Sequence, residues 1–225
     1  SRVGGEMADL PTNMDGLNYT ENSTEYNDFE PGQHYLSLTK TEKNMIDMVT
    51  KNFANVVLVY NGANTLEMGF VNDYPQIKSV IWCPGTGQTG FNALGEIVAG
   101  EVNPSGHSAD TFVYDLTAAP YFNNIGDFAY TNADSVGYTV ASQAGGDAKL
   151  VPPHFVNYVE GIYVGYKFYE TAAAEGLIDY DKTVQYPFGH GLSYTTFTQK
   201  IDSMTEADGT ITLDVTVTNT GSVAG

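Results

Sequence analysis

The stretch Val56-Val57-Leu58-Val59-Tyr60 is an unbroken run of β-branched and apolar residues, and a second apolar run follows at Val80-Ile81-Trp82. Such runs are typical of strands that are buried on both faces of a sheet. Between them, residues 66–71 (Leu-Glu-Met-Gly-Phe-Val) are compatible with a helix. Two strands joined by a helical crossover predict a parallel sheet.

Helical patterns flank these two strands. Residues 39–42 read Thr-Lys-Thr-Glu, a capping box that predicts the start of a helix. Apolar residues then recur on one helical face: Met45, Ile46, Val49 and Phe53. A second apolar set follows the second strand at helical spacing: Phe91, Leu94, Ile97 and Val98. The alternation of helices and strands predicts an α/β fold with helices on the faces of a mostly parallel sheet.

The remaining chain is of two kinds. Residues 1–35 are polar and without apolar periodicity, which predicts a long loop, and residues 107–157 are expected to form an irregular excursion. Residues 210–219 alternate polar and apolar side chains with period 2, as a half-buried antiparallel strand does. One or two such strands cannot bury a face, so we expect an incomplete β-sandwich at this end.

The charge balance excludes some classes of partner. The 225 residues hold 9 Lys and Arg against 27 Asp and Glu, a formal net charge of -18, which disfavours nucleic acids and anionic membranes. No apolar run approaches the ~20 residues that span a bilayer, and residues 1–6 do not read as a signal peptide. The single Cys83 cannot form an internal disulfide, so cytoplasmic and secreted locations both stay open.

Other kinds of site are weakly supported. The four histidines are scattered without metal-ligand spacing, so we predict no metal site. Residues 85–90 (Gly-Thr-Gly-Gln-Thr-Gly) lack the Gly-Lys-Ser/Thr ending of a phosphate loop, and a strand-to-helix turn explains them better. Ser105 and Ser193 have no recognisable His and Asp partners. We therefore expect no cofactor and no serine hydrolase.

Three stretches together resemble glycoside hydrolase family 3, the β-glucosidase-type enzymes. They are residues 1–6 (Ser-Arg-Val-Gly-Gly-Glu) with Asp9, residues 100–106 (Gly-Glu-Val-Asn-Pro-Ser-Gly), and residues 160–166 (Glu-Gly-Ile-Tyr-Val-Gly-Tyr) leading to 188–194 (Phe-Gly-His-Gly-Leu-Ser-Tyr). The closing residues 217–221 (Val-Thr-Asn-Thr-Gly) look like the family's fibronectin-like domain. Each match is weak alone, but all of them occur in the family's order.

The resemblance implies a domain organisation. Such enzymes pair a (β/α)8-type barrel, which supplies an Asp nucleophile, with an α/β sandwich whose loop supplies an acid/base Glu. Residues 1–194 would be the later part of this three-layer sandwich, and residues 195–225 the first strands of a fibronectin type III-like domain. The barrel would lie outside these residues, and the isolated chain would be inactive.

By the same resemblance, Glu6 is the general acid/base. It matches the family pattern Ser-Arg-x-x-Gly-Glu, with Asp9 three residues later. A Glu that donates a proton and later accepts one needs a pKa raised toward neutrality. Arg2 and Asp9 are weaker candidates for orienting the loop or binding sugar hydroxyls. Met7 and Leu10 depart from the usual Gly and basic residue, and a solvated loop carboxylate is the alternative for Glu6.

The function implied is that of a retaining, exo-acting β-glycosidase, with β-glucosidase as the leading expectation. Its substrates would be β-linked oligosaccharides or aryl glycosides, and a homo-oligomer is possible. A non-catalytic carbohydrate-binding or scaffold module with the same fold is the alternative. A flavodoxin-like cofactor binder would need a phosphate or ring site that the sequence does not display.

Overall fold

The computed structural model describes residues 28–30, 33–122, 130–132, 135, 138–140, 149–151, 153, 155 and 157–225. They form two compact units. Unit 1 comprises Ser1–Pro84 and Asp110–Tyr186, and unit 2 comprises Gly85–Ala109 and Pro187–Gly225. Within the described residues, no helix is both long enough and apolar enough to cross a membrane.

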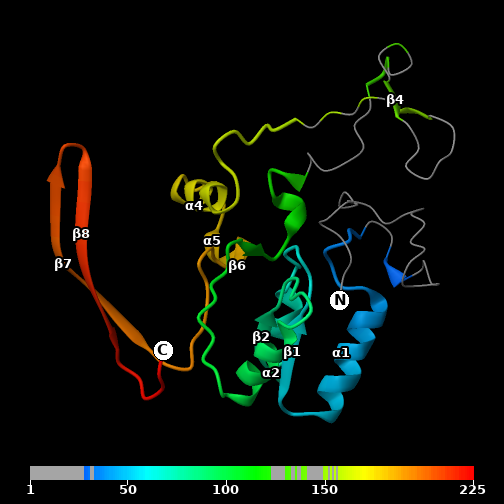
Figure 1. The fold of residues 1–225 in the computed structure, drawn as a ribbon. Coiled ribbons are helices and arrows are strands. Elements are labelled where there is room, and N and C mark those ends of the chain that lie inside the picture. The colour runs from blue at the N-terminus through cyan, green and yellow to red at the C-terminus, as the bar shows by residue number, and fades with distance from the viewer. Residues whose placement is uncertain are drawn as a thin grey trace. The chain divides into compact units, whose positions relative to one another are not determined.

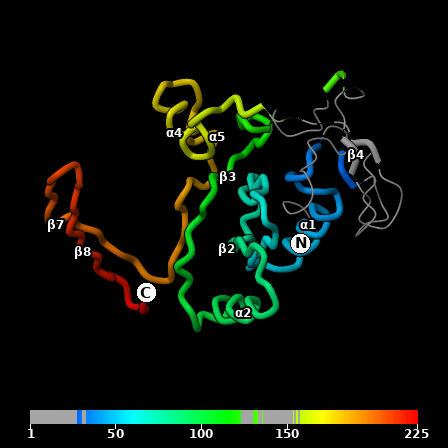
Figure 2. Tube along the Cα trace, turned by 45° about the horizontal axis from the view of Figure 1, so that its top comes forward, coloured from blue at the N-terminus to red at the C-terminus, as the bar shows by residue number. Residues whose placement is uncertain are grey.

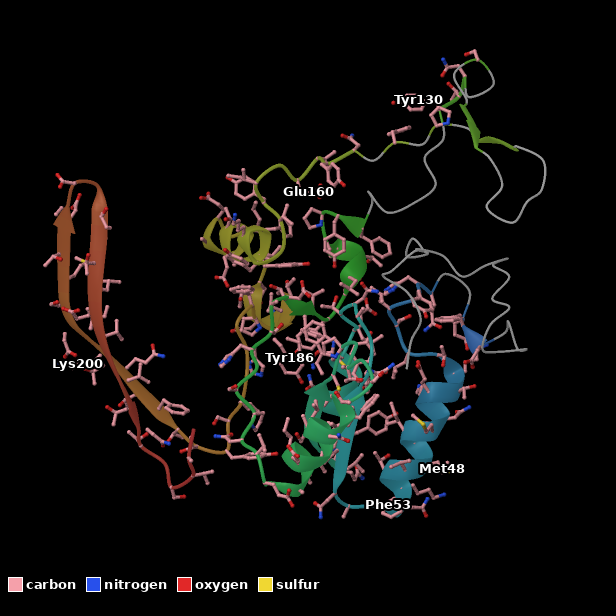
Figure 3. All side chains as sticks on the ribbon, viewed as in Figure 1. Met48, Phe53, Tyr130, Glu160, Tyr186 and Lys200 are labelled. Carbon is pink, nitrogen blue, oxygen red and sulfur yellow. The ribbon has the colours of Figure 1, made fainter. Side chains whose placement is uncertain are left out.

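Unit 1 begins with helix α1 (Lys40–Asn52), which the capping box predicted. The Thr39 hydroxyl accepts a hydrogen bond from the Glu42 N–H, and the Glu42 carboxylate accepts one from the Thr39 N–H. The reciprocal pair satisfies two N–H groups that the start of a helix leaves without partners. The predicted apolar face is only partly covered, because Ile46 is buried whereas Met45 and Phe53 are exposed; Phe53 is labelled in Figure 3.

The two predicted strands pair in parallel, as expected. They are β1 (Val56–Tyr60) and β2 (Ile77–Trp82), and β2 begins earlier than its apolar run suggests. Burial on both faces is wrong for β1 in this chain. Tyr60 is buried, but Val57 is 48% exposed. Helix α1 lies alongside this sheet (Figure 1), and an apolar hollow of about 250 Å³ lies between its side chains and those of β1.

The helix expected at residues 66–71 does not form. Only the 3-10 turn η2 (Gly69–Asp73) is present there. The Glu67 N–H donates to the carbonyl of Leu36 at 3.0 Å, so it is engaged by a distant segment and not by its own preceding turn. Leu66 and Met68 are buried on either side of it. Tertiary packing therefore overrides the local helical pattern.

The rest of unit 1 is made of short elements. They are β3 (Phe112–Val113), η3 (Leu116–Ala118), β4 (Tyr138–Val140), β5 (Lys149–Val151), α4 (Tyr166–Ala174), α5 (Tyr180–Thr183) and β6 (Val184–Tyr186). Strands β3 and β6 are antiparallel, and so are β4 and β5. The expected irregular excursion thus contains short strands, and helix α4 was not among the predicted elements.

An aromatic-rich core holds unit 1 together. Met68, Val113 and Leu116 are its most deeply buried side chains. Trp82 meets Phe112 edge-on at 5.1 Å between ring centroids, and Phe112 meets Tyr186 in the same way at 6.0 Å. Figure 3 shows Tyr186 among the side chains of this region. The core thus joins the parallel strands to the β3–β6 pair.

Unit 2 contains α2 (Phe91–Ala99), β7 (Phe197–Ala207) and β8 (Thr210–Asn219). The predicted helix at α2 is confirmed, and it ends at Gly100 in the left-handed conformation. The predicted antiparallel strand at β8 is also confirmed, and it pairs along its length with β7 (Figure 2). The expected half-burial of β8 is wrong for this chain, because all its residues are exposed. That the hairpin begins a fibronectin type III-like domain stays a prediction.

Candidate functional site

The site residues predicted from the sequence are Glu6, Arg2 and Asp9, and all three lie outside the described residues. The structure therefore tests none of them. What it does describe is the region that follows the segment 1–27 in unit 1, at the carboxyl ends of the parallel strands. Open α/β sheets bind their ligands at this edge.

Hydrogen bonds connect the two chain segments that follow β1 and β2. The Asn61 amide donates to the carbonyl of Cys83 at 2.8 Å, and the Cys83 N–H donates to the carbonyl of Tyr60 at 2.8 Å. The Trp82 indole N–H donates to the carbonyl of Gly62 at 2.9 Å. These bonds hold the chain leaving β1 against the chain leaving β2, and they give the edge a defined shape.

Glu67 lies at the centre of a second group of hydrogen bonds. Its Oε1 accepts from the Nε2 of His34 at 3.0 Å and from the N–H of Leu116 at 2.7 Å. Its own N–H bonds to Leu36. One residue therefore joins three segments: the stretch before α1, the stretch after β1, and the turn η3.

The His34 ring makes two hydrogen bonds, accepting one at Nδ1 and donating the other from Nε2. The Leu36 N–H donates to Nδ1 at 3.1 Å, so Nδ1 is the acceptor and the neutral ring carries its proton on Nε2. That proton points to Glu67. The ring is only 6% exposed, and its edge packs on Phe122 at 5.4 Å. Rotation of the imidazole would break both bonds inside a packed environment.

Two tyrosines with raised pKa values lie in this part of unit 1, and one of them, Tyr121, interacts with the charge of Glu67. Burial raises the pKa of Tyr121 to about 12, with added contributions from the charges of Asp110 and Glu67. Burial also raises the pKa of Tyr169, and its hydroxyl has no hydrogen-bond partner among the described residues. Both phenols are therefore neutral at physiological pH.

The hydrogen bonds around Glu67 link segments of unit 1 and do not form a catalytic group. The described residues contain no group of His, Cys, Asp and Glu side chains that could hold a metal ion. Glu67 has its Oε1 occupied by two donors. Both ring nitrogens of His34 are engaged, by the Leu36 N–H and by Glu67, and the Ser37 hydroxyl donates to the His34 carbonyl at 2.9 Å. The arrangement is that of side chains that join separate segments of unit 1.

Unit 2 brings together two of the stretches that carry the family resemblance. The Asn103 Oδ1 accepts from the Tyr194 N–H at 2.8 Å and from the Ser193 hydroxyl at 3.1 Å. A Cβ added at Gly191 would meet the Gly106 carbonyl oxygen at 2.6 Å, so the close approach requires glycine. Residues 100–106 and 188–194 thus form one packed structural feature.

Sequence reasoning missed the pairing of His34 with Glu67. The histidine was considered only as a metal ligand, and Glu67 was placed in a helix that does not form. Their distance along the chain matches no motif. The one available signal was the position of Glu67 soon after a predicted strand, where site residues of α/β folds gather.

Comparison with known proteins decides the family. Residues 13–166 match the model of the glycosyl hydrolase family 3 C-terminal domain. The chain belongs to glycoside hydrolase family 3. This confirms the predicted fold class, an α/β sandwich domain of that family.

Named family 3 relatives are β-glucosidases. β-Glucosidase A of Butyrivibrio fibrisolvens is 31% identical over 88% of this chain and 22% of its own length. The solved β-glucosidase of Paenibacillus barengoltzii is 29% identical, with a TM-score of 0.64 over 86% of this chain and 18% of its own. β-Glucosidase 3B of Thermotoga neapolitana, solved in complex with glucose, is 26% identical, with a TM-score of 0.63 over 84% and 23%. The chain therefore spans about a fifth of the length of these family 3 proteins.

Proposed function

We propose that this chain is part of a retaining, exo-acting β-glucosidase in which Glu6 is the general acid/base. The match to the family 3 C-terminal domain, whose named relatives are β-glucosidases, is the observation that carries the proposal. The nucleophile in this proposal is an Asp on a barrel domain elsewhere in the full-length polypeptide. Arg2 and Asp9 orient the Glu6 loop or contact sugar hydroxyls.

The chemistry requires both carboxyl groups. One attacks the anomeric carbon while the other protonates the departing glycosidic oxygen, and the two lie about 5–5.5 Å apart in retaining enzymes. The acid/base then takes a proton from the water that hydrolyses the glycosyl-enzyme. A chain with only one of the two groups cannot form the covalent intermediate, so the isolated 225 residues are expected to be inactive.

The test is Glu6→Ala in the full-length enzyme, with Glu175→Ala as the control because Glu175 is an exposed carboxylate at the end of α4. We expect kcat/KM on phenyl β-glucoside to fall by about 10²–10⁴ in Glu6→Ala, the typical contribution of general acid catalysis. With 2,4-dinitrophenyl β-glucoside, whose leaving group departs without protonation, added azide should restore turnover and yield glucosyl azide, since azide attacks the glycosyl-enzyme without a base. Normal turnover in Glu6→Ala without azide rescue would reject the assignment.

The sugar is tested separately with the same full-length protein. A panel of aryl β-glucosides, β-xylosides and β-galactosides should show the highest kcat/KM for the glucosides. A full-length protein that binds these sugars but cleaves none of them would favour the non-catalytic module instead.

A further inference from the structure

We propose that Asn103 anchors the β7–β8 hairpin, by bonding both the segment that enters β7 and the segment that leaves β8 to the loop after α2. This anchor lies within unit 2 and is independent of the role proposed for Glu6. Every residue of the two strands is exposed. A two-stranded hairpin with no buried face is at best marginally stable in water. The hairpin therefore needs support at its two ends.

The turn supports one end of the hairpin. Asp208 and Gly209 join β7 to β8, and both have positive φ angles, 51° and 74°. Positive φ at both central residues is the requirement of a type I′ turn, for which Asp-Gly is a preferred sequence. The twist of this turn matches that of the paired strands. At the other end, where Phe197 pairs with Asn219, no turn closes the hairpin.

The segment that enters β7, residues 193–196, is bonded to Asn103 and to α2. The Asn103 Oδ1 accepts from the Tyr194 N–H at 2.8 Å and from the Ser193 hydroxyl at 3.1 Å. The Tyr194 hydroxyl donates to the carbonyl of Ile97, in the last turn of α2, at 2.8 Å. The entry segment is therefore held both by the helix and by the loop that follows it.

The segment that leaves β8, residues 220–224, returns to the same asparagine. The Asn103 Nδ2 donates to the carbonyl of Ala224 at 3.0 Å. Asn219 folds this exit segment back, because its Nδ2 donates to the Val223 carbonyl at 2.8 Å. The Asn219 Oδ1 also accepts from the Thr195 hydroxyl at 2.7 Å. The two segments are thus bonded to each other by Asn219 and to loop 100–106 by Asn103.

The amide group is what allows one side chain to bond both segments. An amide oxygen has two acceptor sites and an amide nitrogen has two protons to donate. Asn103 uses both acceptor sites for the entry segment and one proton for the exit segment. A carboxylate at this position would keep the two acceptor sites and lose the donor. Asn103→Asp should therefore release the exit segment alone, whereas Asn103→Ala should release both.

The experiment measures amide hydrogen exchange at residue resolution in the full-length protein. Asn103→Ala should speed exchange of the Tyr194 N–H about 5–10-fold, as expected for one lost hydrogen bond, and should speed exchange of residues 220–224 by a similar factor. Asn103→Asp should speed exchange of residues 220–224 alike, but that of Tyr194 by less than about 2-fold. Exchange in α1, which lies in unit 1, should stay unchanged and is the internal reference.

Tyr194→Phe is the matched control. It removes a different hydrogen bond of the entry segment, the one to Ile97, and leaves the Asn103 side chain intact. Exchange of residues 220–224 should therefore change by less than about 2-fold in this variant.

Three outcomes would overturn the anchor. They are unchanged exchange in Asn103→Ala, equal acceleration of both segments in Asn103→Asp, and acceleration of the exit segment in Tyr194→Phe. If Asn103→Ala does not fold, Asn103→Asp and Tyr194→Phe still decide, because only the first should release the exit segment. Loss of protection throughout α2 and the hairpin in both Asn103 variants would show a general effect on the stability of unit 2, and would also reject the proposal.

Discussion

Replacing Met68 by Ala should strongly destabilise unit 1. The Met68 side chain is 1% exposed within the aromatic-rich core, while its carbonyl accepts from the Gln185 amide at 3.0 Å. Removing three buried heavy atoms costs roughly 2–2.5 kcal/mol in transfer free energy at about 0.8 kcal/mol per group. The cavity left behind brings the expected loss to about 3–4 kcal/mol, within the range seen for buried Met→Ala changes. Because this hydrogen bond fixes the Met68 backbone, the surrounding residues cannot close the cavity and regain part of the lost free energy.

Equilibrium urea unfolding measures this loss through the fluorescence of Trp82, the one tryptophan of the chain, which packs on Phe112 in the same core. Met48→Ala is the matched control, because the same atoms are removed from a side chain that is 61% exposed. It should change the free energy of unfolding by no more than about 0.5 kcal/mol. In thermal unfolding, Met68→Ala should lower Tm by about 6–16 °C. Equal effects of the two substitutions would refute the assignment of Met68 to the centre of the core.

Two further outcomes follow from the start of α1. Thr39→Ala removes one half of the capping box and should cost about 1 kcal/mol in urea unfolding, whereas Thr39→Ser should cost much less because it keeps the hydroxyl acceptor. Partial burial would raise the pKa of Asp28, but the hydrogen bonds from Thr41 outweigh it and lower that pKa below its ordinary value. The contribution of Asp28 to stability is thus present above about pH 4 and lost as the pH falls through the lowered pKa. NMR titration should show a higher midpoint for Asp28 in Thr41→Val, and an unchanged midpoint would contradict the assignment.

The elements that the sequence predicted correctly are those with a local physical cause. The capping box at Thr39 and Glu42 works through residues three positions apart, so it can be recognised without knowing the fold. The apolar runs of β1 and β2 are likewise local. The helix expected at residues 66–71 does not form, because the Glu67 N–H donates to the carbonyl of Leu36. A hydrogen bond to a residue so distant in sequence produces no periodic pattern of apolar residues. The exposure of Val57 could not be predicted either. A run of apolar residues shows that a strand is suited to burial, but not which helices or strands cover its faces.

The difference between local patterns and contacts of distant residues also explains which site residues could be predicted. Glu6 is identified through a short pattern that similarity can detect, yet its surroundings are not described. His34 and Glu67 are described in detail, yet no pattern links them. Their connection follows only from hydrogen bonds between separate segments, such as the one from the Leu116 N–H to Glu67 at 2.7 Å. Contacts of this kind are visible in a fold and invisible in a single sequence.

The family motifs themselves need not mark catalytic chemistry. In unit 2, Asn103 binds Ser193, Tyr194 and, through its amide, the carbonyl of Ala224 at 3.0 Å. Gly191 is required there because any side chain would collide with the neighbouring backbone. These residues carry the resemblance, but their interactions serve to join two loops. The stretches that reveal the family are thus partly structural, and the catalytic role proposed for Glu6 must be tested by its proton transfer.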